Sequence, residues 1–339
     1  MIRIDEIYHN VFLPQIKDQT NCSLTWFDPF GSTKFQDICS FPKRKIGKRW
    51  LFWDQEPVHQ HTAKLFFDQF IPAYNTNGET NITVITSEYN SSNVTWLYDT
   101  YGIDNDYYFF HAWAALDWYR GYNRTSLAQP FQDRKPYNTF LCPNNIIGGE
   151  RKHRIEMLQQ LVYRNLLDRN LISFPDVCPY EGQSLELLCK KYNLECPDVR
   201  LPLMIDNGSG YAAQSHRIDL WEQANNSLIH VVTETVATGK RNHLTEKTFK
   251  PIVMQQPFII QSCGGSLEYL RRYGFRTFGE FWDESYDEAN DDIRTKEIGR
   301  LLESLHNMNQ KEKTTLQTAV NSTVEHNYNW FYSEEFEKL

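Results

Sequence analysis

Three residues that could bind a phosphorylated ligand stand together at Thr245, Glu246 and Lys247. A lysine near the start of a helix suits an anionic phosphate, because the helix N-terminus also carries partial positive charge. The glutamate beside it suits the hydroxyls of a sugar or a ribose. Upstream, the β-rich run 228–234 ends in another acid, Glu234. We therefore expect these four residues to form a ligand site.

The elements around these residues read as a strand, a loop, a helix start, a second strand and a Gly-rich turn. The apolar run 251–260 follows the lysine, and Gly264 and Gly265 come soon after it. In an open α/β sheet, ligands bind beyond the carboxyl ends of the strands. We therefore expect the two acids, the lysine and the glycine turn at that edge of a sheet.

Two arginines open another predicted helix. Residues 151–170 carry apolar side chains at helical spacing, after a predicted strand at 137–142. Arg151 and Arg154 fall in the first turn, where cations oppose the helix dipole. An anion bound between them would offset that cost. Ordinary surface arginines are an equally open interpretation.

Two acids follow an aromatic strand near the N-terminus. The run 49–53 leads to Asp54 and Glu56, and Pro57 stiffens the loop that holds them. As a pattern alone, this is more typical of a polar strand end with a helix cap than of a catalytic site. A general base is the second interpretation.

The length and composition indicate a globular chain of two domains. It has 339 residues, of which 40% are hydrophobic and 14% aromatic. Strand–helix units repeat through 1–118, and a polar stretch with Gly and Pro precedes the next strand. We expect an α/β protein with two Rossmann-like doubly wound domains. The predicted limits are 1–125 and 126–318, with a C-terminal helix at 319–339 that packs back on the N-terminal domain.

Charge and cysteine usage exclude some functions. The net charge is −8 and the pI about 5.7, which disfavours a large DNA-binding face, although the basic segment 43–49 keeps DNA possible. The seven cysteines form no CxxC pair, and no secretory signal or membrane span is visible. We expect a cytoplasmic protein without zinc. A metal-binding DxD at Asp104 and Asp106 is a weaker alternative.

Taken together, these segments resemble α-1,3-fucosyltransferases. The run His-Leu-Thr-Glu-Lys-Thr-Phe-Lys at 243–250, after an acid-ended strand, is similar to the donor-site signature of that family. Residues 140–144 and 154–161 resemble the family's strand, Asn-containing loop and Arg-led helix. Residues 50–57 resemble its aromatic strand, which ends in a catalytic-loop acid.

A second likeness points to bacteriophages. The run 257–278 and the acidic loop 283–287 resemble glycosyltransferase-like proteins of phages, which would place the chain in a host cytoplasm. The loop between Glu234 and Glu246 is longer than the fucosyltransferase pattern and lacks its Glu-Asn-Ser. The donor is therefore not assigned to GDP-fucose.

The resemblance implies a metal-independent, inverting glycosyltransferase of the GT-B fold, with a cleft between two domains. Arg154 and Lys247 would stabilise the charge of the diphosphate leaving group, and Glu246 would bind sugar or ribose hydroxyls. Glu56, or otherwise Asp54, would deprotonate the acceptor hydroxyl. The donor, a nucleoside diphosphate sugar, is a substrate, and no cofactor is expected. The other expected donor-site residues are Arg151, Glu234, Thr245, Gly264 and Gly265.

Two other functions stay open. The chain could be an inactive sugar-binding or virion-associated protein on a transferase fold, but a decayed copy is expected to lose its phosphate contacts. Arg154, Glu246 and Lys247 are all present. The acceptor could also be a modified base of DNA rather than a glycan, which the acidic composition disfavours.

Overall fold

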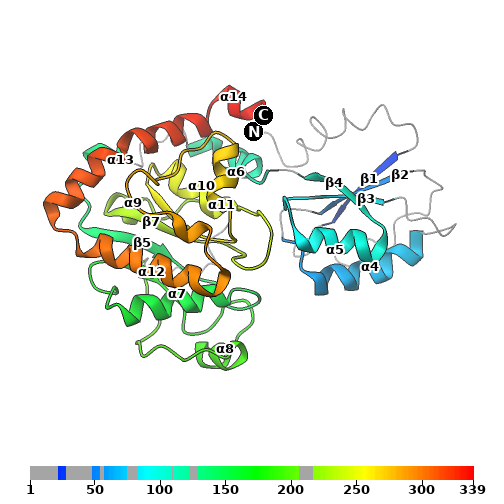
Figure 1. Ribbon diagram of the computed structural model, residues 1–339, viewed down its shortest axis with the longest axis horizontal. Coiled ribbons are helices and arrows are strands. Elements are labelled where there is room, and N and C mark those ends of the chain that lie inside the picture. The colour runs from blue at the N-terminus through cyan, green and yellow to red at the C-terminus, as the bar shows by residue number, and fades with distance from the viewer. Residues whose placement is uncertain are drawn as a thin grey trace. The chain divides into compact units, whose positions relative to one another are not determined.

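The computed structural model describes residues 22–27, 48–53, 57–74, 82–108, 110–122, 129–205 and 217–339. The chain divides into two compact units. Unit 1 contains Met1–Asp117 and Gly239–His243, and unit 2 contains Trp118–Thr238 and Leu244–Leu339. The predicted α/β class is confirmed, because each unit contains a four-stranded parallel sheet with helices (Figure 1).

Unit 1 is built on a sheet of order β1-β2-β3-β4. Its helices α4 and α5 lie between consecutive strands in the chain, as expected for parallel strands that need crossover connections. All five residues of β3 are buried. The bounds are β1 Cys22–Phe27, β2 Lys48–Trp53, α4 Gln60–Tyr74, β3 Ile82–Thr86, α5 Ser92–Tyr101 and β4 Asp104–Tyr108.

Aromatic residues form much of the core of unit 1. Trp53, at the end of β2, stacks on Phe67 of α4 with ring centroids 6.3 Å apart. Phe66 meets the same indole edge-on at 6.1 Å, and all three side chains are buried. Phe66 and Phe67 are consecutive in α4, and Trp53 comes from the strand that precedes this helix. Their packing fixes α4 against the sheet.

Unit 2 is built on a sheet of order β6-β5-β7-β8. Figure 1 shows α7 and α12 on one side of this sheet and α10 and α13 on the other. The central strand β7 is buried at all seven positions, as is typical of a parallel strand covered on both faces. The bounds are β5 Asn138–Pro143, α7 Lys152–Tyr163, β6 Leu171–Ser173, α8 Leu185–Tyr192, α9 Trp221–Asn225, β7 Ser227–Thr233, α10 Glu246–Val253, β8 Phe258–Gln261, α11 Ser266–Arg272, α12 Asp291–Asn307, α13 Gln310–Phe331 and α14 Glu334–Glu337.

The direction of winding reverses between β5 and β7. The chain leaves β5 through α7 to reach β6 on one side, and leaves β7 through α10 to reach β8 on the other. The two loops that follow β5 and β7 therefore diverge at the carboxyl edge of the sheet. In open α/β sheets such a switch point is where ligands bind.

The long loop between β7 and α10 contributes a short segment to unit 1. Asn242 and Tyr89 exchange backbone hydrogen bonds of 2.8 and 2.9 Å, which form an antiparallel bridge. In the same unit, Arg241 lies 3.4 Å from the buried carboxylate of Glu88. The ion pair and the bridge fix this segment. The loop between β7 and α10 thus has a structural role in unit 1.

The division of the chain differs from the expected domain limits. It falls between Asp117 and Trp118, inside helix α6 (Ala112–Tyr119), and it keeps the C-terminal helices in unit 2. Phe331 at the end of α13 stacks on Phe249 of α10 with centroids 5.7 Å apart. Late aromatic residues thus cover the outer face of α10, which explains why the tail stays with unit 2.

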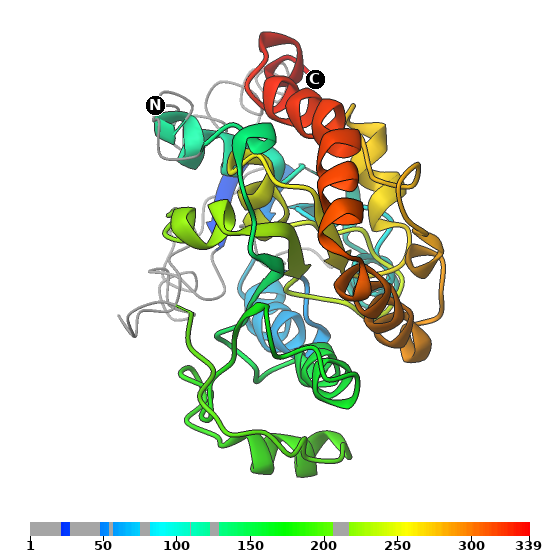
Figure 2. The ribbon, with the colours of Figure 1, turned by 90° about the vertical axis from the view of Figure 1, so that its left-hand side faces the viewer.

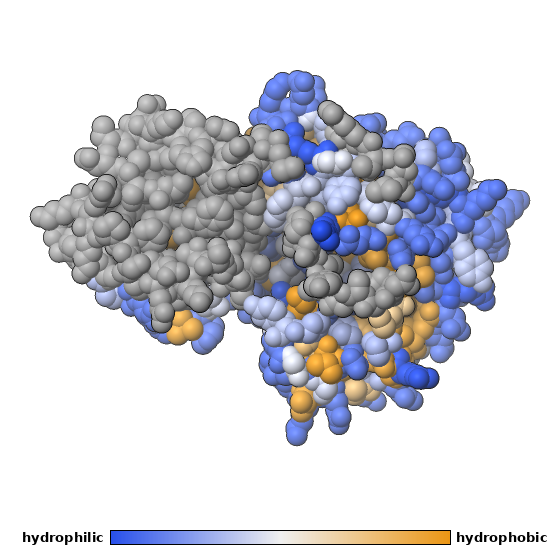
Figure 3. Space-filling model, turned by 180° about the vertical axis from the view of Figure 1, so that it is seen from behind, coloured by the Kyte–Doolittle hydropathy of each residue, from blue (hydrophilic) through white to orange (hydrophobic). Residues whose placement is uncertain are grey.

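Figures 1 and 2 both show α8 beyond α7, away from the sheet. On the face seen in Figure 3, the described residues are mainly hydrophilic. Large apolar side chains that are exposed near α8 include Val177, Tyr180 and Leu187. Among the described residues, each helix is too short or too polar to cross a membrane.

Candidate functional site

The candidate site lies beyond the carboxyl ends of β5 and β7 in unit 2. Asn144, directly after β5, accepts a hydrogen bond of 2.7 Å on Oδ1 from the Thr233 hydroxyl at the end of β7. The backbone N–H of Asn144 also donates to the carbonyl of Ser173 at the end of β6, at 3.0 Å. These bonds hold the three strand ends in register. The candidate site is therefore built on strand ends that are fixed relative to one another.

Glu234 follows β7 and is fully buried. Its Oε1 accepts hydrogen bonds from the Thr245 amide at 2.9 Å and the Thr248 hydroxyl at 2.6 Å. Its Oε2 accepts from the Thr245 hydroxyl at 2.6 Å and the Thr235 amide at 3.1 Å. The carboxylate therefore joins the end of β7 to the first turn of α10.

Helix α10 begins where the sequence predicts a helix start. Thr245 is the N-cap residue, with extended backbone, and its hydroxyl accepts from the Lys247 amide at 3.4 Å. The Lys247 ammonium lies 2.9 Å from a Glu246 oxygen and 3.2 Å from the Thr235 hydroxyl. The Lys247 side chain is 33% exposed and that of Glu246 is 8% exposed. The Lys247 side chain is therefore the more exposed of the two.

The two arginines of α7 differ in exposure. Arg154 is buried, and its guanidinium donates to the carbonyl oxygens of Ile146 at 2.7 Å, Thr233 at 2.9 Å and Glu234 at 3.1 Å. Burial, together with the nearby charge of Arg151, lowers the pKa of Arg154 to about 9. Arg151 is half-buried at the start of the same helix. Both cations lie at the switch point, so the site is electropositive on this side.

Two residues of this region were not singled out by the sequence. Nε2 of His153 donates to the Glu234 carbonyl at 2.9 Å, and burial lowers the pKa of this histidine to about 3. Lys250 is one helical turn after Glu246, and burial lowers its pKa despite that carboxylate. The four-residue spacing of Glu246 and Lys250 was the available signal. For His153, the sequence offered only its place between Arg151 and Arg154.

The glycine turn after β8 is followed by backbone amides that bind a carboxylate of this same chain. The amides of Ser266 and Leu267 donate to the two carboxylate oxygens of Asp287, each at 3.0 Å. Gly265 has a φ of 78°, which favours glycine, and a Cβ at Gly264 would lie 2.9 Å from the Arg294 guanidinium. The glycines thus permit a close approach of this chain's own groups. The expected role of Gly264 and Gly265 in donor binding stays a prediction.

The expected acids of the first part of the chain fall into two groups. Asp54 and Glu56, the candidate bases, lie outside the described residues. Asp104 and Asp106 stand in strand β4 of unit 1. In the part of the chain that the structure describes, no three His, Cys, Asp or Glu side chains gather in a metal-binding group. The structure therefore brings the expected donor-site residues of α7, β7 and α10 together and leaves the base as an expectation.

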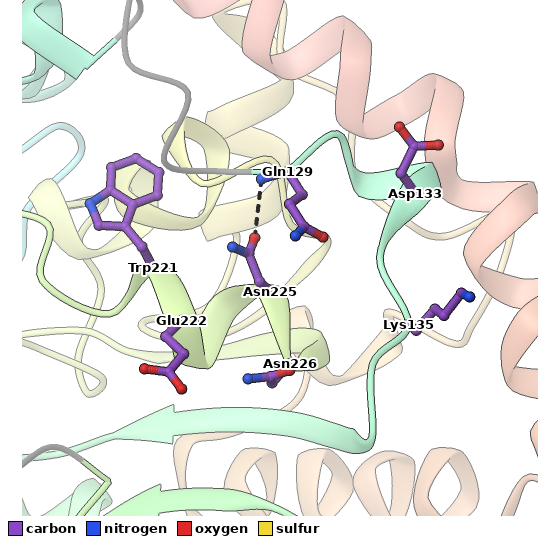
Figure 4. A pocket seen from close by; sticks show the side chains of 7 residues that line it. All are labelled: Gln129, Asp133, Lys135, Trp221, Glu222, Asn225 and Asn226. Carbon is purple, nitrogen blue, oxygen red and sulfur yellow. Dashed lines mark hydrogen bonds between the residues drawn. The ribbon is translucent and has the colours of Figure 1, made fainter.

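A separate cavity of about 520 Å³ lies at the opposite, amino edge of the same sheet. Asn226, on its rim, directly precedes β7, and the Gln129 amide donates to Asn225 Oδ1 at 3.3 Å. Figure 4 shows the side chains around it pointing in different directions, without a common focus. The lining residues are Gln129, Asp133, Lys135, Trp221, Glu222, Asn225 and Asn226. This cavity is not the site that the sequence predicted.

Comparison with known proteins gives little further information. No family model matches the chain, and no curated protein matches it. Among solved structures, the chain is similar to a glycosyltransferase from Rickettsia africae ESF-5, with 12% sequence identity and a TM-score of 0.37. That alignment covers 99% of this chain and 81% of the other. At this level of similarity, the function is inferred from the residues of the candidate site.

Proposed function

We propose that the chain is a glycosyltransferase that moves a sugar from a nucleoside diphosphate sugar to an acceptor hydroxyl. One observation carries the proposal. At the switch point of the unit 2 sheet, Lys247 lies beside Glu246 at the N-terminus of α10, and Arg154 interacts electrostatically with Glu246 and with Arg151. Cations, a helix start and a neighbouring acid are what a diphosphate with attached sugar hydroxyls requires.

The residues take different parts in this proposal. Lys247 contacts the diphosphate, because its side chain is partly exposed and its ammonium is held by Thr235 and Glu246. Arg154 is buried and adds charge from beneath the site, while the half-buried Arg151 reaches the ligand. As the donor bond breaks, these cations stabilise the negative charge that develops on the leaving diphosphate. Glu246 accepts hydrogen bonds from ribose or sugar hydroxyls.

The finer points of the proposal rest on the resemblance to fucosyltransferases and phage glycosyltransferases. They are a GT-B arrangement, inversion at the sugar carbon, catalysis without a divalent metal, and Glu56 or Asp54 as the base. In an inverting transfer, the base removes the acceptor proton while the hydroxyl oxygen attacks from the face opposite the diphosphate. The acceptor is a glycan or another hydroxyl compound, with a modified DNA base as the alternative.

A thermal-shift screen with UDP, GDP, ADP and CDP in EDTA tests the proposal. A ligand that binds only the native state raises the melting temperature, so one nucleotide should stabilise the protein in a concentration-dependent way. The Lys247→Ala variant is the matched control and should lose that shift. If all four nucleotides leave the melting temperature unchanged, the proposal is wrong. If one binds but its sugar conjugate is never consumed, the inactive binding protein is the better account.

A further inference from the structure

We propose that Glu234 is a positioning residue: it sets the first turn of α10 for the diphosphate and does not itself touch the ligand. The inference rests on the proposed function and deepens it. The sequence placed Glu234 among the donor-binding residues because it ends a strand at the edge of the sheet. Its contacts in the structure support a different role.

The acceptor capacity of the Glu234 carboxylate is already used. An ionised carboxylate offers about four acceptor positions on its two oxygens. Glu234 receives four hydrogen bonds from the protein, two on each oxygen, and the side chain is fully buried. No acceptor position is left for a sugar hydroxyl. A phosphate group would be repelled by the charge.

Three of the four bonds come from the two threonines that hold Lys247, Thr235 and Thr245. The Thr245 hydroxyl has one proton and gives it to Glu234 at 2.6 Å, so its lone pairs face the Lys247 amide and ammonium, each at 3.4 Å. Glu234 also holds the amide of Thr235, whose hydroxyl accepts from the Lys247 ammonium at 3.2 Å. Both threonines that hold the ammonium are thus fixed by one carboxylate.

Helix α7 supports Glu234 from the other side. Its backbone carbonyl accepts hydrogen bonds from His153 at 2.9 Å and from Arg154 at 3.1 Å. The end of β7 therefore cannot shift without breaking contacts to both α7 and α10. A group held this rigidly positions Lys247 before the ligand arrives, and preorganisation of this kind strengthens binding and catalysis.

A double-mutant cycle tests the inference, with binding of UDP, GDP and inorganic pyrophosphate measured by calorimetry. Glu234→Gln places an NH₂ group against a donor of Thr245 and, depending on which way the amide lies, against a donor of Thr235 or of Thr248. It should weaken binding about tenfold or more, as lost positioning of one charged contact does. Lys247→Met should also weaken binding. The double variant should bind within about twofold of Lys247→Met alone, because Glu234 acts through that lysine.

Several outcomes separate the inference from the function on which it rests. If the two effects multiply in the double variant, Glu234 contacts the ligand and the inference is wrong. Unchanged affinity in Glu234→Gln contradicts it as well. If Lys247→Met itself binds like the natural protein, the proposed function fails instead. Glu268→Gln, which neutralises an exposed acid of α11, is the control and should bind normally.

A second variant keeps the test decisive if Glu234→Gln does not fold. Thr248→Val keeps the shape of the side chain and removes one of the four hydrogen bonds to Glu234. It should weaken pyrophosphate binding by about threefold, and this effect should vanish in the Lys247→Met background. An effect of the same size in both backgrounds contradicts the inference.

Discussion

His153 holds Glu234 through a buried hydrogen bond of 2.9 Å from the imidazole Nε2 to the backbone carbonyl. The ring is therefore neutral, with its proton on Nε2. Burial, the charge of Arg154 and the pKa of about 3 agree with that state. This bond joins the first turn of α7 to the end of β7, where the donor site is proposed.

The protein should lose stability in mild acid through this histidine. The folded pKa of about 3 lies below the ordinary 6.5, so the contribution is complete above pH 6.5 and falls as the pH drops. One such group changes the free energy of unfolding by about 1.4 kcal/mol per pH unit within that window. His230, whose pKa burial lowers to about 4, adds to the slope.

Urea unfolding of the natural protein and of His153→Gln, between about pH 7 and pH 4.5, measures this effect. The glutamine amide can still donate to the Glu234 carbonyl but does not titrate. The slope of stability against pH should be smaller in the variant by about the amount of one histidine. Parallel curves for the two proteins would show that His153 does not titrate on unfolding.

Lys247→Ala and Arg154→Ala should separate binding from stability. Both should weaken the affinity for the nucleoside diphosphate by about 1.5–3 kcal/mol, the range for hydrogen bonds to charged groups. Arg154→Ala should also destabilise the unliganded protein by about 3 kcal/mol, because it removes a buried guanidinium that donates hydrogen bonds to three backbone carbonyls. Lys247→Ala, at a partly exposed position, should change stability by less than about 0.5 kcal/mol.

Calorimetry for the affinity and urea unfolding for the stability give the two readings. Arg300→Ala removes an exposed arginine of α12 and is the matched control for both. Normal affinity in Lys247→Ala and Arg154→Ala together would remove the phosphate role from this region.

Sugar transfer should not require a divalent metal. The reason is that Lys247, Arg151 and Arg154 already place positive charge where the leaving diphosphate is proposed to lie. Turnover should stay within about twofold in EDTA and should not rise with Mn²⁺. Loss of turnover in EDTA, with recovery on addition of Mn²⁺, would favour the alternative site at Asp104 and Asp106.

The base is tested by Glu56→Gln, which keeps the shape of the side chain and removes proton acceptance. Turnover should fall about 10²–10⁴-fold, while the affinity for the nucleoside diphosphate persists. Asp54→Asn is the parallel variant, because alternate residues of an extended segment point to the same side. If only Asp54→Asn loses turnover, the roles are exchanged. If neither does, the base lies elsewhere in the chain.

The sequence predicts the elements of unit 2 well and its internal contacts poorly. The strand ends at Pro143 and Thr233 and the helix start at Thr245 follow from periodicity and capping residues, which are local signals. Burial of Arg154 and the four bonds of Glu234 depend on groups far away in the chain. No local pattern distinguishes a buried arginine that binds carbonyls from one that binds phosphate.

Distant partners also explain why local patterns do not reveal the contacts of the glycine turn and of the loop before α10. Gly264 and Gly265 are typical of a ligand-binding turn, but the amides that follow them donate to Asp287 of the acidic loop. Gly239–His243 reads as part of the loop before α10, yet it belongs to unit 1 through Glu88 and Tyr89. In both cases the deciding partner is distant in sequence, so spacing alone could not reveal it.

Hydrogen–deuterium exchange, with and without the nucleotide that stabilises the protein, locates the surface that binds the donor. We expect slower exchange at residues 245–249 of α10 and at 144–154, the loop and helix start after β5. Lys247→Ala should lose both effects at the same nucleotide concentration. Protection confined to 129–135 and 221–226, around the cavity at the opposite edge of the sheet, would contradict the account.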